Sequence, residues 1–144
     1  MSHIPFSLRF ILGFSGVGLL FSAYLVVVKI FSGTCPVNET CPSLFNIPAC
    51  WYGLALFIVL ITLSVFTARE RISFANGIVS IMGVSFFGVL YAGYFTAIEL
   101  PTFMHKGFTA YTFGVPTCFM GLVFFMLTFV TATFGWNHYR QHQR

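Results

Sequence analysis

Four long runs of residues without a charged side chain are the feature that most restricts the fold of this chain. A helix needs about 20 predominantly apolar residues to cross the hydrocarbon core of a bilayer. Within lipid, only helices and closed barrels satisfy the backbone hydrogen bonds, and uninterrupted runs of this length are typical of helices. The runs are Phe10–Val28, Asn46–Ala68, Ile72–Ile98 and a fourth that extends from Gly107 to Asn137.

These runs predict an all-α fold, an integral membrane four-helix bundle in a single domain that covers residues 1–144. The expected helices are approximately 9–30, 47–68, 73–98 and 114–137. The composition agrees, because 58% of the residues are hydrophobic and only 7% are charged, whereas soluble domains are about 25% charged. The net charge of +4 comes from a few basic residues at the ends of apolar runs, which indicates membrane orientation and not nucleic-acid binding.

The distribution of Lys and Arg predicts the orientation of the helices. Five arginines fall on one side of the expected bundle, and two lysines, Lys29 and Lys106, fall on the other. Lys and Arg are enriched in cytoplasmic loops, so both termini are expected in the cytoplasm. The arginines are Arg9, Arg69, Arg71, Arg140 and Arg144.

With this orientation, all four cysteines lie at the outer face of the membrane. They are Cys35, Cys41, Cys50 and Cys118. The periplasm, the cell exterior and the lumen of the endoplasmic reticulum permit disulfides, and a Pro-rich polar loop carries Cys35 and Cys41, so a disulfide within this loop is favoured. Cys50 and Cys118 lie in apolar surroundings, where a cysteine can also be a small buried hydrophobe.

A short motif occurs twice and indicates an internal repeat. Ile47–Leu54 and Val115–Leu122 both contain Pro-x-Cys-x-x-Gly-Leu and open the second and fourth expected helices. Gly16-Val17 and Gly83-Val84 precede the two motifs at nearly equal distances. Two halves in the same orientation predict two parallel two-helix repeats about a pseudo-twofold axis along the membrane normal. Cys50 would then be the symmetry mate of Cys118.

Small residues on the first and third expected helices predict close helix packing. Gly18 and Ser22 have the small-x-x-x-small spacing, and so do Gly88 and Ala92. We interpret these pairs as helix contacts and not as a site.

The position of each repeated cysteine favours thiol chemistry. Proline is common at the first position of a helix, so Pro48 and Pro116 predict where the second and fourth helices begin. Cys50 and Cys118 then fall in a first turn, where unpaired backbone N–H groups stabilise an anion such as a thiolate. Burial in lipid acts in the opposite direction and disfavours the thiolate, and the sequence does not decide which effect is larger. Thiol–disulfide exchange requires direct contact between sulfur atoms, and nine residues separate Cys41 from Cys50.

The chain resembles the vitamin K epoxide reductase family and, more remotely, the bacterial quinone-linked disulfide-forming membrane oxidases. The resemblance rests on the first apolar run from Gly18 to Lys29, the loop pair Cys35 and Cys41, Ser43, and Asn46-Ile47-Pro48 at the start of the second helix. It implies a four-helix bundle around a quinone, with electrons passing from a thioredoxin-like partner on the outer face. It also implies that Asn46 contacts the quinone, although an asparagine before a helix is equally suited to cap it.

The chain departs from this family at the start of the fourth helix. The family has a Cys-x-x-Cys there, whereas this chain has Val115 three residues before Cys118. The Tyr that the family places one turn later is replaced by Leu122. Either Cys50 pairs with Cys118 in place of the missing motif, or the bundle has lost the chemistry.

The sequence therefore leaves open two hypotheses for the function, which belong to different classes. The first is a membrane thiol–disulfide oxidoreductase that passes electrons from outer-face dithiols to a quinone, with Cys35, Cys41, Cys50 and Cys118 as catalytic residues and the plasma membrane of a prokaryote as its location. The second is a non-catalytic bundle that acts as a membrane partner or scaffold. A transporter is disfavoured because no ionisable residue lies in the middle of a run. A metal site from Cys50, Cys118 and His105 lacks a supporting spacing motif.

Overall fold

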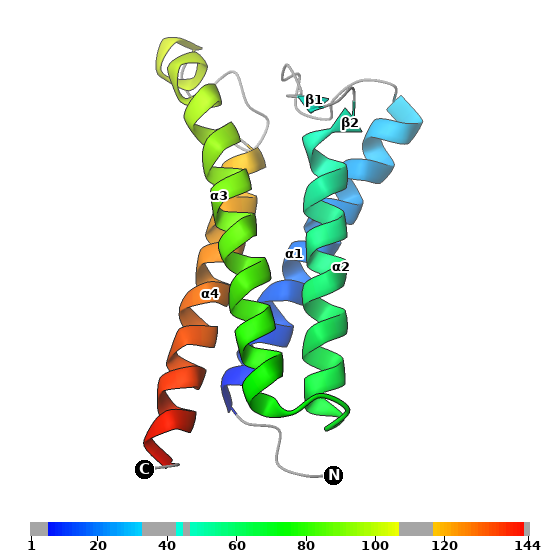
Figure 1. Ribbon diagram of the computed structural model, residues 1–144. Coiled ribbons are helices and arrows are strands. Elements are labelled where there is room, and N and C mark those ends of the chain that lie inside the picture. The colour runs from blue at the N-terminus through cyan, green and yellow to red at the C-terminus, as the bar shows by residue number, and fades with distance from the viewer. Residues whose placement is uncertain (1–5, 33–42, 45–46, 107–116, 143–144) are drawn as a thin grey trace.

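Four antiparallel helices form the fold, as expected from the apolar runs (Figure 1). The computed structural model describes residues 6–32, 43–44, 47–106 and 117–142. The helices and the two short strands between α1 and α2 are α1 (Phe6–Ser32), β1 (Ser43–Leu44), β2 (Ile47–Pro48), α2 (Ala49–Ala68), α3 (Phe74–Lys106) and α4 (Thr117–His142). All four helices are long and apolar enough to cross a membrane, so the chain is an all-α, multi-pass membrane protein.

The helices run up, down, up and down around a square. Each helix packs mainly against two neighbours: α1 against α2 and α4, and α3 against the same two. The start of α1, the end of α4 and the α2–α3 turn all lie at one end of the bundle (Figure 1). The start of α1 and the end of α4 thus share one side, which agrees with the expected topology. The starts of α2 and α4, with Cys50 and Cys118, lie at the other end, called here the cysteine end.

The turn between α2 and α3 is built from two helix caps. At the end of α2, the N–H of Arg71 donates to the carbonyl of Phe66 and the N–H of Glu70 donates to that of Thr67, which is the Schellman arrangement. Glu70 has the positive φ of 56° that this cap needs, although glycine is the usual residue there. The Oγ of Ser73 accepts from the N–H of Asn76 and caps α3.

Three helices extend past the ends of the charge-free runs, since α1 begins at residue 6, α3 ends at residue 106 and α4 ends at residue 142. The expected end of the third helix at residue 98 was wrong, because α3 continues through Pro101 to Lys106. A charged residue limits the part of a helix that lies in lipid but does not break its hydrogen bonds. A proline removes one hydrogen bond of the helix and does not always end it.

The internal repeat is present, but its register in the first helices differs from the one expected. Buried positions of α1 match those of α3 when 70 is added to the residue number, as in Ser15 and Ser85, and those of α2 match α4 when 68 is added, as in Phe57 and Phe125. Gly18 is therefore the mate of Gly88. The expected match of Gly16-Val17 with Gly83-Val84 is wrong, since the spacing of 70 residues pairs Gly83 with Gly13 and places Phe86 at the position of Gly16.

Close contacts follow the same symmetry. A Cβ atom on Gly18 would collide with the ring of Phe57, and one on Gly88 would collide with the ring of Phe125. The small residues that were interpreted as helix contacts thus make space for an aromatic ring from the partner helix of the same half. At the opposite end of the bundle, a Cβ on Gly77 would meet Thr67, and one on Gly135 would meet Ser7, which are again symmetry-related pairs.

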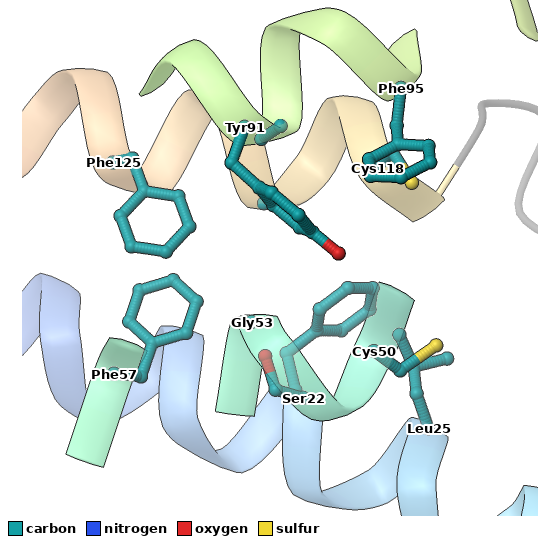
Figure 2. A pocket seen from close by; sticks show the side chains of 12 residues that line it. Ser22, Leu25, Cys50, Gly53, Phe57, Tyr91, Phe95, Cys118 and Phe125 are labelled. Carbon is teal, nitrogen blue, oxygen red and sulfur yellow. The ribbon is translucent and has the colours of Figure 1, made fainter. Parts of the chain in front are cut away.

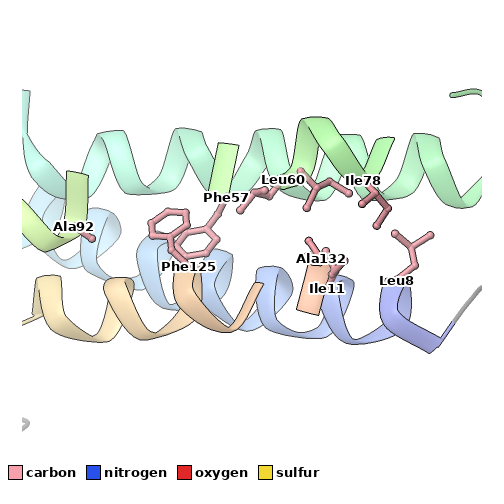
Figure 3. Packing of buried hydrophobic residues seen from close by; sticks show 9 residues of the cluster. Leu8, Ile11, Phe57, Leu60, Ile78, Ala92, Phe125 and Ala132 are labelled. Atoms are coloured by element: carbon pink, nitrogen blue, oxygen red, sulfur yellow. The ribbon is translucent and has the colours of Figure 1, made fainter. Parts of the chain in front are cut away.

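The rings of Phe57 and Phe125 pack against each other at the centre of the core (Figure 3). Their centroids lie 4.4 Å apart and their planes are nearly parallel, at 6°. Because the two residues are mates, their mutual contact marks the pseudo-twofold axis. From this pair, the core extends toward the α2–α3 turn through Leu60, Ile11, Ile78 and Leu8, and Ala92 lies on the other side of the pair, toward the cysteine end.

Candidate functional site

A cavity lies on the pseudo-twofold axis, between the Phe57–Phe125 pair and the cysteine end (Figure 2). Its twelve lining residues are six pairs of symmetry mates. They are Phe21 and Tyr91, Ser22 and Ala92, Leu25 and Phe95, Cys50 and Cys118, Gly53 and Gly121, and Phe57 and Phe125. The cavity has a volume of about 60 Å³, which is room for a few water molecules, and it is partly open to its surroundings.

Cys50 and Cys118 both reach this cavity. Each is the second residue of its helix, α2 or α4, so the prediction that both lie in a first helical turn is confirmed. Each side chain is partly buried, and the two lie on facing sides of the cavity, at the end away from Phe57 and Phe125 (Figure 2). The structure has no disulfide between Cys50 and Cys118. The repeat thus brings two sulfur-bearing side chains from different halves to one cavity.

The remainder of the wall is apolar and largely aromatic. Phe21, Phe95, Phe57 and Phe125 contribute rings, and Gly53 and Gly121 leave space where side chains would otherwise stand. Pockets for organic molecules usually combine such walls with a few placed polar groups. This small cavity likewise combines apolar walls with a few polar groups.

Two hydroxyl groups break the symmetry of the wall. Tyr91 of α3 is the mate of Phe21 of α1, and Ser22 of α1 is the mate of Ala92 of α3. The Oη atom of Tyr91 is buried and has no hydrogen-bond partner in the described part of the chain. The Tyr91 ring lies 5.6 Å from that of Tyr52 and 4.9 Å from that of Phe95, measured between centroids. These neighbours fix the phenol with its oxygen toward the cavity (Figure 2).

The other residues of the expected site cannot be compared with the structure. Cys35, Cys41 and Asn46 lie outside the described residues, as do Val115 and Pro116. Pro48 is described and stands one residue before the first residue of α2, at the end of β2. Its expected position at the very start of the helix is therefore correct to within one residue.

Sequence reasoning missed Tyr91. A tyrosine within an apolar run has no local pattern that separates it from a lipid-facing tyrosine such as Tyr94, which is 62% exposed. The repeat offers the missing signal, because the spacing of 70 residues places Tyr91 opposite Phe21 and one residue before the mate of Ser22.

No family model matches the chain, and no curated protein or solved structure matches it either.

Proposed function

We propose that the protein is a membrane thiol–disulfide oxidoreductase of the vitamin K epoxide reductase type, which passes electrons from outer-face dithiols to a quinone. The observation that carries this proposal is the placement of Cys50 and Cys118, symmetry mates from two halves, at one axial cavity. Cysteines that act only as small buried hydrophobes could lie anywhere in the core and would not need to share a cavity. Two cysteines favour redox chemistry when they share a cavity with a hydroxyl that has no partner among the described residues.

In this proposal, Cys50 and Cys118 form the inner redox pair and replace the Cys-x-x-Cys that the chain lacks. Their two thiols lose two electrons and two protons when a disulfide joins them. Cys35 and Cys41 act as the shuttle pair, which regenerates the inner thiols by disulfide exchange and is itself reduced by a thioredoxin-like protein on the outer face. Exchange proceeds by attack of a thiolate on a disulfide sulfur, through a mixed disulfide.

The residues of the cavity fit the quinone that the proposal requires. Quinones are flat apolar rings with carbonyl oxygens that accept hydrogen bonds, and the cavity has ring-bearing walls and a buried hydroxyl without a partner among the described residues. The enclosed 60 Å³ is smaller than such a ring, so the open part of the cavity would have to hold part of it. When bound, a quinone accepts the two electrons and two protons that the thiols release. Asn46 is proposed as a further contact.

The finer location follows from the orientation of the bundle. The cysteine end lies opposite the end that carries Arg9, Arg69, Arg71 and Arg140. By the positive-inside rule, the cysteine end faces outward, and we propose the plasma membrane of a prokaryote as the membrane.

The proposal is tested by mapping the disulfides of the purified protein. The fully reduced protein is incubated with a short-chain 1,4-benzoquinone, alkylated and analysed by mass spectrometry. We expect the quinone to produce a Cys50–Cys118 disulfide, and we expect Cys50→Ser and Cys118→Ser each to stop turnover with a dithiol. The variant Ser64→Ala, which changes a buried hydroxyl outside the cavity, is the matched control and should retain turnover.

If Cys50 and Cys118 stay alkylatable under all conditions, the inner pair does not exist. The bundle would then be a membrane partner or scaffold without catalysis, and the double variant Cys50→Ser/Cys118→Ser should keep its binding partners.

A further inference from the structure

Tyr91 has the one buried hydroxyl of the cavity wall that lacks a partner within the described residues. A buried tyrosine hydroxyl usually finds a hydrogen-bond partner, because a polar group removed from water without one is destabilising. Such a group in a packed wall therefore needs an explanation, and an acceptor atom that enters the cavity would supply one.

The neighbours of Tyr91 hold the hydroxyl in place and do not satisfy it. Phe95 meets the Tyr91 ring edge to face, at 65°, and Tyr52 packs against it from α2 at 48°. These contacts with rings from α2 and α3 restrict the rotation of the phenol. The oxygen points into the space between the two halves (Figure 2). A donor that is already oriented loses little freedom when an acceptor arrives.

The repeat carries this hydroxyl in one half only. The mate of Tyr91 is Phe21, which has no polar side-chain atom and packs against Phe124 with 6.5 Å between centroids. The two cysteines are equivalent by symmetry, whereas the phenol is present on one side only. A ligand with an acceptor oxygen would therefore bind this cavity in one orientation.

We propose that the Tyr91 hydroxyl donates a hydrogen bond to a carbonyl oxygen of the quinone and so fixes its orientation. This inference rests on the quinone binding proposed above. It assigns the donor role to α3, where the resemblance to the family gave no expectation. Tyr91 acts as a binding residue, and the thiol chemistry belongs to the cysteines.

The test measures binding directly. A short-chain 1,4-benzoquinone with ¹³C at its carbonyl carbons is titrated into the detergent-solubilised protein and followed by infrared spectroscopy and by quenching of tryptophan fluorescence. We expect the carbonyl band of the wild type to move to lower frequency on binding, and we expect a smaller shift in Tyr91→Phe. The Kd should rise about three- to tenfold in this variant, as for one lost hydrogen bond.

Two further variants complete the design. Tyr94→Phe removes a lipid-exposed hydroxyl from the same helix and should bind like the wild type. Phe21→Tyr in the Tyr91→Phe background returns a hydroxyl at the symmetry-related position and should restore the band shift. Tyr91→Phe should unfold no more easily than the wild type in the absence of quinone, because the lost hydroxyl has no partner in the described part of the protein.

The outcomes separate this inference from the proposed function. Equal Kd values and equal band shifts in wild type and Tyr91→Phe overturn the role of Tyr91 and leave the redox proposal intact. A band shift that depends on Tyr91 in a protein whose thiols stay inert supports the role of Tyr91 and overturns the redox function. A wild type that binds no quinone overturns both.

Discussion

Replacement of Gly88 by alanine tests the packing that forms the inner end of the cavity. A Cβ atom at Gly88 would lie less than 3.0 Å from three ring carbons of Phe125. The ring cannot simply swing away, because its other face stacks on Phe57 at 4.4 Å. The substitution therefore forces α3 to shift against α4 and also disturbs the aromatic stack on the axis.

The expected cost follows from these two contacts. An extra methyl group in a packed core costs about 1–3 kcal/mol. Loss of an aromatic pair costs about 0.5–1.5 kcal/mol beyond the buried area. Together they predict that the collision in Gly88→Ala lowers the free energy of unfolding by about 2–4 kcal/mol. Alanine also has a higher helix propensity than glycine, and this gain of up to about 1 kcal/mol partly offsets the loss.

A glycine on the same helix serves as the control for helix propensity. Gly83 has no atom within 4 Å of its ideal Cβ position, so Gly83→Ala changes propensity without a collision. Unfolding is followed by circular dichroism in mixed micelles with increasing denaturing detergent. The difference in the free energy of unfolding between the two variants gives the cost of the collision and should be about 2–4 kcal/mol. Equal stabilities of Gly88→Ala and Gly83→Ala would refute both the packing and the register of the repeat.

Two other substitutions have clear expected outcomes in the same unfolding assay. Phe57→Ala removes half of the axial stack and should cost about 3–5 kcal/mol, whereas Phe134→Ala, at a residue that is 70% exposed toward lipid, should change stability by less than about 1 kcal/mol. Glu70→Gly should stabilise the protein by about 1 kcal/mol, because Glu70 has a φ of 56° that glycine adopts without strain, and Glu70→Ala should give no such gain.

The number and approximate positions of the helices were predictable because a membrane span depends on length and hydropathy alone. The helix ends were less predictable, since hydrogen bonding continues where lipid contact ends. Pro101 illustrates this difference: it follows Glu99 closely and is typical of a helix stop, yet α3 includes both residues. The two-residue strands before α2 had no signal in the apolar runs.

The site was predictable only where the repeat was visible as a motif. Cys50 and Cys118 stand in matching sequences, so their common cavity followed from symmetry. The register of α1 against α3 was not visible, because glycines occur at several positions in both helices. The buried positions of the two helices, and the packing of Gly18 and Gly88 against phenylalanine rings, identify these two glycines as mates.

The cavity wall is asymmetric at the positions where the two halves of the repeat differ. Symmetric pairs such as Gly18 and Gly88, or Phe57 and Phe125, fill the same role in each half, and a change in one should cost about as much as a change in its mate. Tyr91 has no such equivalent, because Phe21 stands in its place. A molecule bound on the axis meets a cysteine from either side but a tyrosine hydroxyl from only one. The pairs that match therefore hold the bundle together. Of the pairs that differ, Phe21 and Tyr91 are the one that would orient the ligand proposed above between the two cysteines.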